Sequence, residues 1–143
     1  MLEVKPIQSK VEQEAACARC GIAYDADLLA YAATVDGELV GVCQFTLAEE
    51  GGSVRSLGTT AGRESDFEAL FVLGRAALNF IDLCGVHRAA YDAPVEGEAA
   101  ERLIRAIGFA PNEAGRWCVD LTHFFAHPCQ NHATNTNAEE RQI

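Results

Sequence analysis

Three apolar segments joined by two short turn sequences fill residues 27 to 60, and they restrict the possible fold more than any other feature of the chain. The first turn is Asp36–Gly37, a dipeptide favoured in two-residue hairpins because both residues tolerate positive φ. The second turn lies in the sequence EEGGS at residues 49–53. Turns this short join neighbouring antiparallel strands, so this region predicts three strands paired in sequence order.

A helical periodicity replaces the strand pattern after residue 63. Between residues 64 and 84, apolar residues recur mostly three or four positions apart, as on one face of a helix. They are Phe67, Leu70, Phe71, Leu73, Leu78, Phe80, Ile81 and Cys84. Gly85 predicts the end of this helix, and the sequence HRAAYDA that follows predicts a short strand.

The two ends of the chain carry their own start and stop signals. Ser9 and Glu12 form a capping-box pattern that predicts a helix ending at Gly21, after a short first strand. A further helix is predicted from Pro94 to Gly108, because proline is favoured at the first helical position and glycine just after the last. A hairpin with the tip PNEAG completes the pattern.

This order of elements predicts an α+β fold, with a mixed, mostly antiparallel central sheet and helices packed on both faces. We expect a single domain over residues 1–127, since a chain of 143 residues can bury one core without disulfides or metals. Residues 128–143 are polar, and we expect them to form a disordered tail.

The formal net charge of −10 narrows the classes of partner. It argues against binding to nucleic acids or anionic membranes, because their phosphate groups would be repelled. It suits a cationic or amine partner, although acidity also commonly serves solubility. The chain shows neither a signal-peptide pattern nor an apolar run of about 20 residues that could cross a bilayer, so we expect a soluble, cytoplasmic protein.

The cysteines allow several interpretations. Cys17 and Cys20 form a Cys-x-x-Cys pair, and the sequence HFFAHPCQNH at residues 123–132 adds three histidines and Cys129. Together they could form a mixed zinc site, or Cys17 and Cys20 could form a redox pair. Cys17 and Cys20 lie on a predicted helix, and the chain has no second Cys-x-x-Cys. Both observations favour free thiols and the absence of a metal site.

Three stretches of the chain resemble the GNAT superfamily of acyl-CoA-dependent N-acyltransferases. The sequence DGELVGVCQF looks like the second hairpin of that family, and LGRAALNFIDLCGV is similar to its helix after the pyrophosphate loop. The sequence AERLIRAIGFAPNEAGRWCVDL resembles the family's closing helix and final hairpin. The resemblance covers residues 2 to 121 and implies the same α+β fold.

The resemblance also implies a binding mode for acetyl-CoA as co-substrate. In this family a strand splays from its neighbour, and the pantetheine arm of the cofactor pairs with the exposed backbone. Here that strand is VRSLGTT, with Leu57, Gly58 and Thr59 offering main-chain groups. The pyrophosphate is then expected on backbone amides at the start of the long helix, near Leu73, Gly74 and Arg75.

Four positions depart from the pattern of that family. Ala69 occupies a loop position where the family has Gln or Arg, and Val72 occupies one where the family has glycine. Gly97 stands where many members have Asn, and Ile104 where many have the Tyr that protonates the leaving thiolate. These departures leave two functions open, an N-acetyltransferase that acts on a primary amine by direct attack, and a catalytically inactive ligand-binding or subunit-interaction protein.

Candidate catalytic groups lie near the expected cleft. We predict roles for Tyr91, at the end of the strand that should flank the acyl group, and for Glu68; Asp66 and Asp92 are further candidates. Each also has a structural reading, since carboxylates favour a helix N-terminus and a Tyr commonly packs in the core with a solvated hydroxyl. The Phe124–Phe125 pair could pack back on the sheet or form a homodimer contact.

Overall fold

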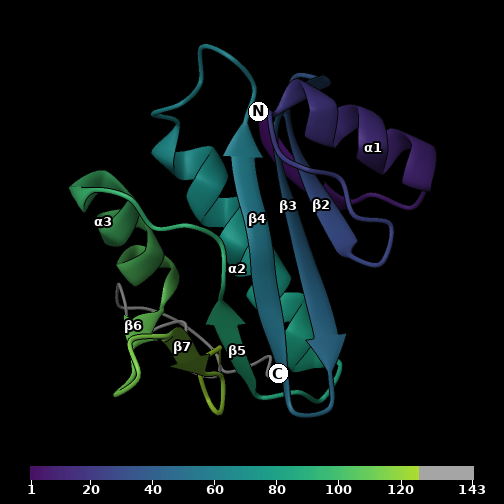
Figure 1. Cartoon of the computed structure of the whole chain (residues 1–143). Helices are drawn as coiled ribbons and strands as arrows, with labels where there is room; N and C mark the ends of the chain where they lie inside the picture. The colour runs from purple at the N-terminus through teal and green to yellow at the C-terminus, as the bar shows by residue number, and fades with distance from the viewer. Residues whose placement is uncertain (126–143) are drawn as a thin grey trace.

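The computed structural model describes residues 1–125, which form a seven-stranded sheet and three helices (Figure 1). The elements in chain order are β1 (Leu2–Pro6), α1 (Lys10–Arg19), β2 (Leu29–Val35), β3 (Glu38–Ala48), β4 (Gly51–Thr59), α2 (Phe67–Leu83), β5 (Arg88–Tyr91), α3 (Glu98–Ile107), β6 (Ala110–Pro111) and β7 (Trp117–Asp120). The sheet order is β1-β2-β3-β4-β5-β7-β6. Among these strands only β4 and β5 pair in parallel, which confirms the predicted mixed, mostly antiparallel α+β fold.

Strands β2, β3 and β4 pair antiparallel in sequence order, as the turn sequences predict, and β1 pairs antiparallel with β2 at the edge of the sheet. Asp36 and Gly37 adopt φ of 51° and 87°, which matches the tight hairpin turn between β2 and β3. Gly51 opens β4 directly after the second turn. The strong local turn signals therefore specify this half of the sheet.

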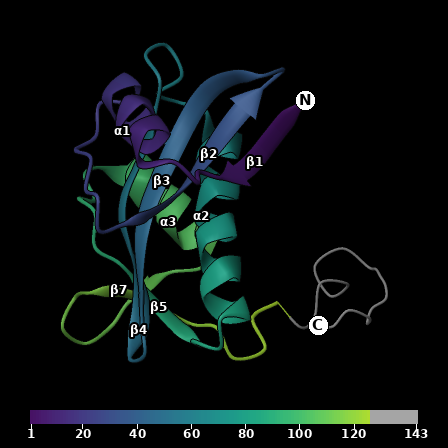
Figure 2. The same cartoon turned by 90° about the vertical axis from the view of Figure 1, so that its right-hand side faces the viewer.

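Helices cover both faces of the sheet, and Figure 2 shows α1 and α2 on opposite sides of the strands. Helix α1 buries Ala16, Cys17 and Cys20 against Ala30 and Val42. Helices α2 and α3 pack on the other face, where the larger core lies. That core contains Phe45, Val54, Leu73, Leu78, Ile81, Ile104, Ile107 and Phe109, all at most 2% exposed.

Two glycines let α2 approach the sheet closely. A Cβ on Gly41 would lie 2.9 Å from Leu73 Cδ1, and one on Gly52 would lie 2.4 Å from Ile81 Cδ1. Both distances are well below a normal carbon–carbon contact of about 3.5 Å. The side chains of α2 therefore occupy the space that these strand residues leave empty, and this contact fixes the height of the helix above β3 and β4.

The helix ends agree with the predictions at α1 and differ at α3. The Ser9 hydroxyl accepts a hydrogen bond from the Glu12 amide at 3.3 Å, and Gly21 follows α1 with φ of 70°, as the capping-box pattern predicts. Helix α3 begins at Glu98 and not at Pro94, so the predicted start is wrong by four residues. Gly97 precedes it with φ of 94°, a conformation that cannot continue a right-handed helix.

The C-terminal part of the described chain folds back on the main core. The ring centroids of Phe124 and Phe125 lie 4.8 Å apart in an edge-on arrangement, and both rings pack against that core. No helix within residues 1–125 is long and apolar enough to span a membrane. The predicted domain end at residue 127 and the tail at 128–143 lie outside the described residues and stay predictions.

Candidate functional site

The sheet parts between β4 and β5 after three residue pairs. Gly52, Ser53 and Val54 pair with Ala89, Ala90 and Tyr91, and the last bond joins the Asp92 amide to the Val54 carbonyl at 2.8 Å. Residues 55–59 continue β4 beyond this point, and in Figure 1 this half of β4 extends past the end of β5. Backbone groups of alternate residues there face away from β3, so the edge is open to an extended ligand.

Leu57, Gly58 and Thr59, the residues predicted to pair with a cofactor arm, lie on this open edge and pair with β3 on their other side. The predicted splaying of this strand is therefore present. Gly58 has a further reason to be glycine, because a Cβ there would lie 3.0 Å from the Cys20 carbonyl oxygen and 2.9 Å from Ile22 Cγ2. The end of β4 is thus held closely against the end of α1.

A β-bulge in β4 decides which side chains reach each face at the gap. Gln44 is paired with Ser56 and Phe45 with Val54, so Arg55 is an extra residue in β4. The bulge inverts the alternation after Val54, which turns Ser56 toward α1 and Leu57 toward α2 and α3. Nothing in the sequence pattern indicated this residue.

A cleft of about 480 Å³ opens on the α2 and α3 side of the gap. Leu57 from β4 and Tyr91 from β5 lie on the two sides of the split, and Leu70 of α2 and Leu103 of α3 contribute further apolar wall. The rest of the lining comes from Glu64, Ser65, Phe67, Pro94, Ala99, Ala100 and Arg102. The interior is mostly apolar, with charged groups restricted to Glu64 and Arg102, which suits an uncharged, extended ligand.

Tyr91 is the buried polar group of this cleft. It is 7% exposed, and its ring packs edge-on against Phe109 at 5.6 Å. Burial, and then the neighbouring Cys43, raise the pKa of Tyr91 to about 12. Because its pKa is about 12, this phenol remains protonated at neutral pH. No group within residues 1–125 forms a hydrogen bond with its hydroxyl, so the hydroxyl can donate to a bound ligand.

The opposite side of the gap has a second cavity of about 550 Å³, which contains Arg55, Ser56 and Asp92 and is bordered by the loop after α1. The Asp92 carboxylate accepts from Arg116 Nε at 3.0 Å and Nη2 at 2.8 Å, and from the Ser53 hydroxyl. The Arg116 hydrogen bonds lead the causes that lower the pKa of Asp92. Asp92 is therefore a saturated, ionised partner of Arg116 and poorly suited to act as a general base.

Two buried glutamines fix the loop that borders this second cavity. Gln44 Oε1 accepts from Gln13 Nε2 at 2.9 Å and from the Asp25 amide at 3.2 Å. Its Nε2 donates to the Ala23 carbonyl at 2.8 Å and to the Ser56 hydroxyl at 2.9 Å. With all four bonds made, Gln44 holds the loop beside the gap. No local pattern indicated this pair, because its two residues lie 31 positions apart.

The predicted position of Leu73, Gly74 and Arg75 at the N-terminal end of the long helix is wrong. Helix α2 begins at Phe67, so these residues lie near its middle, where their amides serve the helix itself. Leu73 and Gly74 are buried. A Cβ on Gly74 would lie 2.6 Å from Ile107 Cδ1, so this glycine makes room for α3.

Three further positions singled out in α2 and α3 do not line the cleft. Arg75 Nε donates to the Ile107 carbonyl at 2.7 Å, which ties α2 to the end of α3. Glu68 is exposed in the first turn of α2 and does not line the cleft. Ile104, at 1% exposure, is a core residue. The Glu68 carboxylate therefore does not line the cleft, and Ile104 brings no hydroxyl group to it.

Cys17 and Cys20 are buried thiols under α1, and burial is the main cause that raises the pKa of each. No metal-binding cluster of His, Cys, Asp and Glu occurs within residues 1–125. The predicted ligands His127, Cys129 and His132 lie outside the described residues. The zinc interpretation thus gains no support from the described part of the chain.

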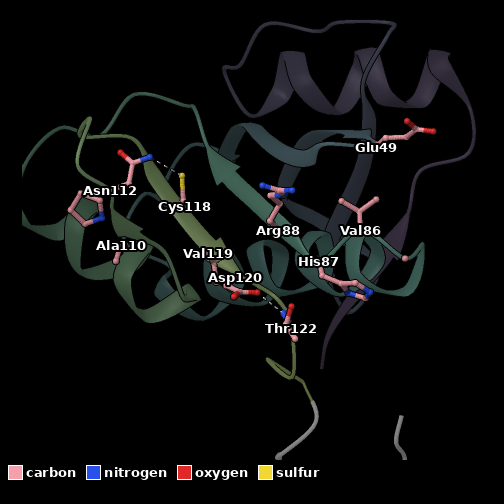
Figure 3. A pocket seen from close by; sticks show the side chains of 12 residues that line it. Glu49, Val86, His87, Arg88, Ala110, Asn112, Cys118, Val119, Asp120 and Thr122 are labelled. Atoms are coloured by element: carbon pink, nitrogen blue, oxygen red, sulfur yellow. Dashed lines mark hydrogen bonds between the residues drawn. The ribbon is translucent and has the colours of Figure 1, made fainter.

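A larger cavity of about 700 Å³ lies at the other end of β5 (Figure 3). Its side chains spread over β5, β6, β7 and the adjoining turns and do not converge on one point. The Asp120 carboxylate accepts from the Thr122 amide, and Asn112 Nδ2 donates to Cys118 Sγ at 3.6 Å. Because it lies away from the gap between β4 and β5, we regard the cleft at Tyr91 as the candidate site.

Comparisons with known proteins identify the fold. No protein-family model matches the chain, and no curated protein matches it in sequence. Among solved structures, the ribosomal-protein-S18-alanine N-acetyltransferase of Escherichia coli aligns over 100% of both chains with a TM-score of 0.64 and 10% identity. A putative acetyltransferase of the GNAT family from Desulfovibrio desulfuricans aligns with 85% of this chain and 100% of its own, with a TM-score of 0.63 and 11% identity.

A third structure is the NatC complex bound to Gag peptide and CoA, one chain of which aligns with a TM-score of 0.67 and 17% identity. The alignment covers 85% of this chain and 99% of that one. At these identities the comparisons show the fold alone. The chain has the fold of the GNAT acetyltransferases, as the sequence resemblance implied.

Proposed function

We propose that this protein is an N-acyltransferase that binds the acyl-pantetheine arm of an acyl-CoA such as acetyl-CoA in the cleft beside Tyr91. The observation that carries the proposal is the gap between β4 and β5, which combines an open backbone edge at residues 55–59 with an apolar cleft of about 480 Å³. An extended amide-containing arm could pair with that edge as an additional strand would. The shared fold with solved N-acetyltransferases supports the same reading.

The reaction that fits this site is direct aminolysis of the thioester. The amine nitrogen bonds to the carbonyl carbon, the carbon–sulfur bond breaks, and the electron pair leaves on sulfur while the amine loses a proton to solvent. Holding both reactants at the gap supplies proximity, which is worth several kcal/mol. The second cavity, on the α1 side, meets the same gap at Ser56 and Asp92 and would admit the amine.

In this proposal Tyr91 donates a hydrogen bond and keeps its proton. Its pKa of about 12 lies well above the value of about 8.5 for a thiol, so full transfer to a thiolate would be unfavourable. A fixed donor still stabilises negative charge that develops on the carbonyl oxygen or on sulfur. This role does not need Glu68.

A second candidate function is a ligand-binding protein without catalysis. The observation that favours it is the replacement of a phosphate loop by the first two turns of α2, together with the burial of Ile104. Such a protein would bind a thioester or acyl ligand in the same cleft without releasing a thiol.

Filling the cleft tests both candidates. Ala99 is exposed on α3 and lines the cleft, so Ala99→Trp should block it without disturbing the core. Ala106→Trp is the matched control, on the same helix and exposed but outside the cleft. Calorimetry with acetyl-CoA, and a thiol-release assay with a panel of primary amines, should show loss in the first variant alone. Binding without thiol release would favour the second candidate, and no binding to the parent protein would refute both.

A further inference from the structure

We propose that the acyl donor is recognised through its acyl-pantetheine arm alone, because the chain's own carboxylates already occupy the positions where a pyrophosphate would bind. The substrate class is therefore an acyl-pantetheine thioester, with or without a nucleotide. This inference rests on the proposed function, since it concerns the donor that enters the cleft beside Tyr91.

Two side chains of the loop before α2 bind the backbone amides that an anion would use. The Gly62 amide donates to both oxygens of Glu64, each at 3.1 Å. The Ala69 amide, in the first turn of α2, donates to Asp66 Oδ1 at 3.1 Å. Each carboxylate thus takes the place of a phosphate oxygen at a group that normally attracts one.

Three further amides near the start of α2 donate to carbonyl groups of the same loop. The Arg63 amide donates to the Thr60 carbonyl at 3.0 Å, and the Asp66 amide to the Arg63 carbonyl at 3.0 Å. The Phe67 amide donates to the Ser65 carbonyl at 2.8 Å. A phosphate could bind these three amides only by breaking these bonds, which lowers the binding energy that the helix N-terminus offers.

The local charge also opposes a phosphate. Glu64, Asp66 and Glu68 lie within five residues of one another. Of the two cations near them, Arg63 is paired with Asp66 at 2.9 Å and Arg102 lines the cleft together with Glu64, so the carboxylates outnumber the cations. Bonds from backbone amides are the leading cause that lowers the pKa of both Glu64 and Asp66, so both remain charged at neutral pH. A pyrophosphate at this end of α2 would meet net negative charge within a Debye length of about 8 Å.

The neighbouring cleft shows the opposite character and points to an uncharged ligand. Leu57, Leu70 and Leu103 form an apolar wall, and Tyr91 presents a buried hydroxyl without a partner in the described residues. Tyr91 as a whole residue is only 7% exposed, and the polar group of a buried side chain normally has a hydrogen-bond partner, so its unpaired hydroxyl in this cleft points to a ligand that accepts from it. An acyl carbonyl or an amide of the arm meets that requirement.

The test compares acetyl-CoA with S-acetylpantetheine, which has the same arm and acyl group and no phosphate. Calorimetry on the full chain should give dissociation constants within about threefold of each other. Raising the salt concentration from about 0.05 to about 0.5 M should leave the affinity for acetyl-CoA unchanged or improve it, because salt screens the repulsion from the loop. A site that grips phosphate would lose affinity over the same range.

A charge-removing variant sharpens the comparison. Glu64→Gln should strengthen the binding of acetyl-CoA by about threefold to tenfold and change that of S-acetylpantetheine by a smaller factor, because Glu64 lines the cleft but its charge repels only a ligand with phosphate groups. Glu113→Gln is the matched control, because Glu113 is exposed on the tip of the last hairpin and changes the net charge equally. A stronger response to Glu64→Gln than to Glu113→Gln shows that the effect is local.

The outcomes separate the inference from the proposed function. If acetyl-CoA binds at least about tenfold more tightly than S-acetylpantetheine, a difference of about 1.4 kcal/mol, the phosphates are recognised and the inference is wrong while the proposed function stands. The same holds if Glu64→Gln weakens acetyl-CoA. If neither thioester binds to the parent protein at millimolar concentration, the proposed function fails and the inference with it.

Discussion

Replacement of Gly74 distinguishes a glycine that serves packing from one that serves a phosphate. We expect Gly74→Val to destabilise the fold and to affect ligand binding only through stability. An ideal Cβ at this position would lie 2.6 Å from Ile107 Cδ1 and 3.1 Å from both Cγ atoms. Relative to a normal contact of about 3.5 Å, these distances are too short by about 0.4 to 0.9 Å, and the Val methyl groups add further crowding.

The magnitude follows from two opposing effects. Overpacking a well-filled core costs about 1–3 kcal/mol, while replacing glycine by valine in a helix returns about 0.3 kcal/mol of helix propensity. The free energy of unfolding should therefore fall by about 1–3 kcal/mol. Urea denaturation followed by circular dichroism should show a lower midpoint with an unchanged slope. Asn79→Val, exposed in the same helix, should change stability by no more than about 0.5 kcal/mol.

A double mutant locates the crowding at Ile107. Alone, Ile107→Val should cost about 0.5–1.5 kcal/mol, because it removes a buried methyl group. In a Gly74→Ala background the same change removes the atom nearest to the new Cβ, so its cost should shrink by at least about 0.5 kcal/mol. Additive effects, or a Gly74→Val variant that is as stable as the parent but has lost ligand binding, would refute the packing explanation.

Three further substitutions probe the site and its support. Tyr91→Phe should lower kcat/KM about 10- to 100-fold, measured as thiol release, with little change in stability, because it removes a donor and no packing. Asp66→Ala should lower the free energy of unfolding by about 1 kcal/mol, because it removes the cap of α2. The folded pKa of Asp66 is lowered, so this stabilisation is present above the unfolded pKa of about 3.9 and is lost as pH falls through the folded pKa. The stabilities of parent and variant, measured by urea denaturation, should therefore converge in acid. Gln44→Leu should cost about 1–3 kcal/mol and increase the exchange of the Asp25 amide, which donates to Gln44 Oε1; normal protection of that amide would contradict the role given to Gln44.

The sequence predicted the order of elements because their signals are local. The Asp36–Gly37 turn, the Ser9 cap and the glycine after α1 each depend on residues within one turn of the chain. The start of α2 near Phe67 was predicted for the same reason, since the apolar spacing is a local signal. The resemblance to a phosphate loop, however, put the expected pyrophosphate near Gly74, which lies in the middle of the helix. Asp66, three residues before the amide it caps, carried the correct signal.

The candidate site could be predicted only in part. Leu57 and Tyr91 follow from the resemblance, and the structure brings them to the same cleft. The bulge at Arg55 could not be predicted, because a one-residue shift of register leaves no mark on the alternation of β4 before it is paired. The contact between Gln13 and Gln44 depends on how α1 docks, a property of the tertiary structure and not of either segment.

The short parallel pairing of β4 with β5 has a consequence for the order of folding. It joins Gly52 to Ala89 across 37 residues of chain, whereas β2 and β3 meet through a two-residue turn. Closing the longer loop costs more chain entropy, and only three residue pairs and the packing of α2 reward it. We therefore expect strands β2 to β4 to form early and β5 to β7 to join late, which makes the gap that holds the cleft the last part of the sheet to be completed and the first to open.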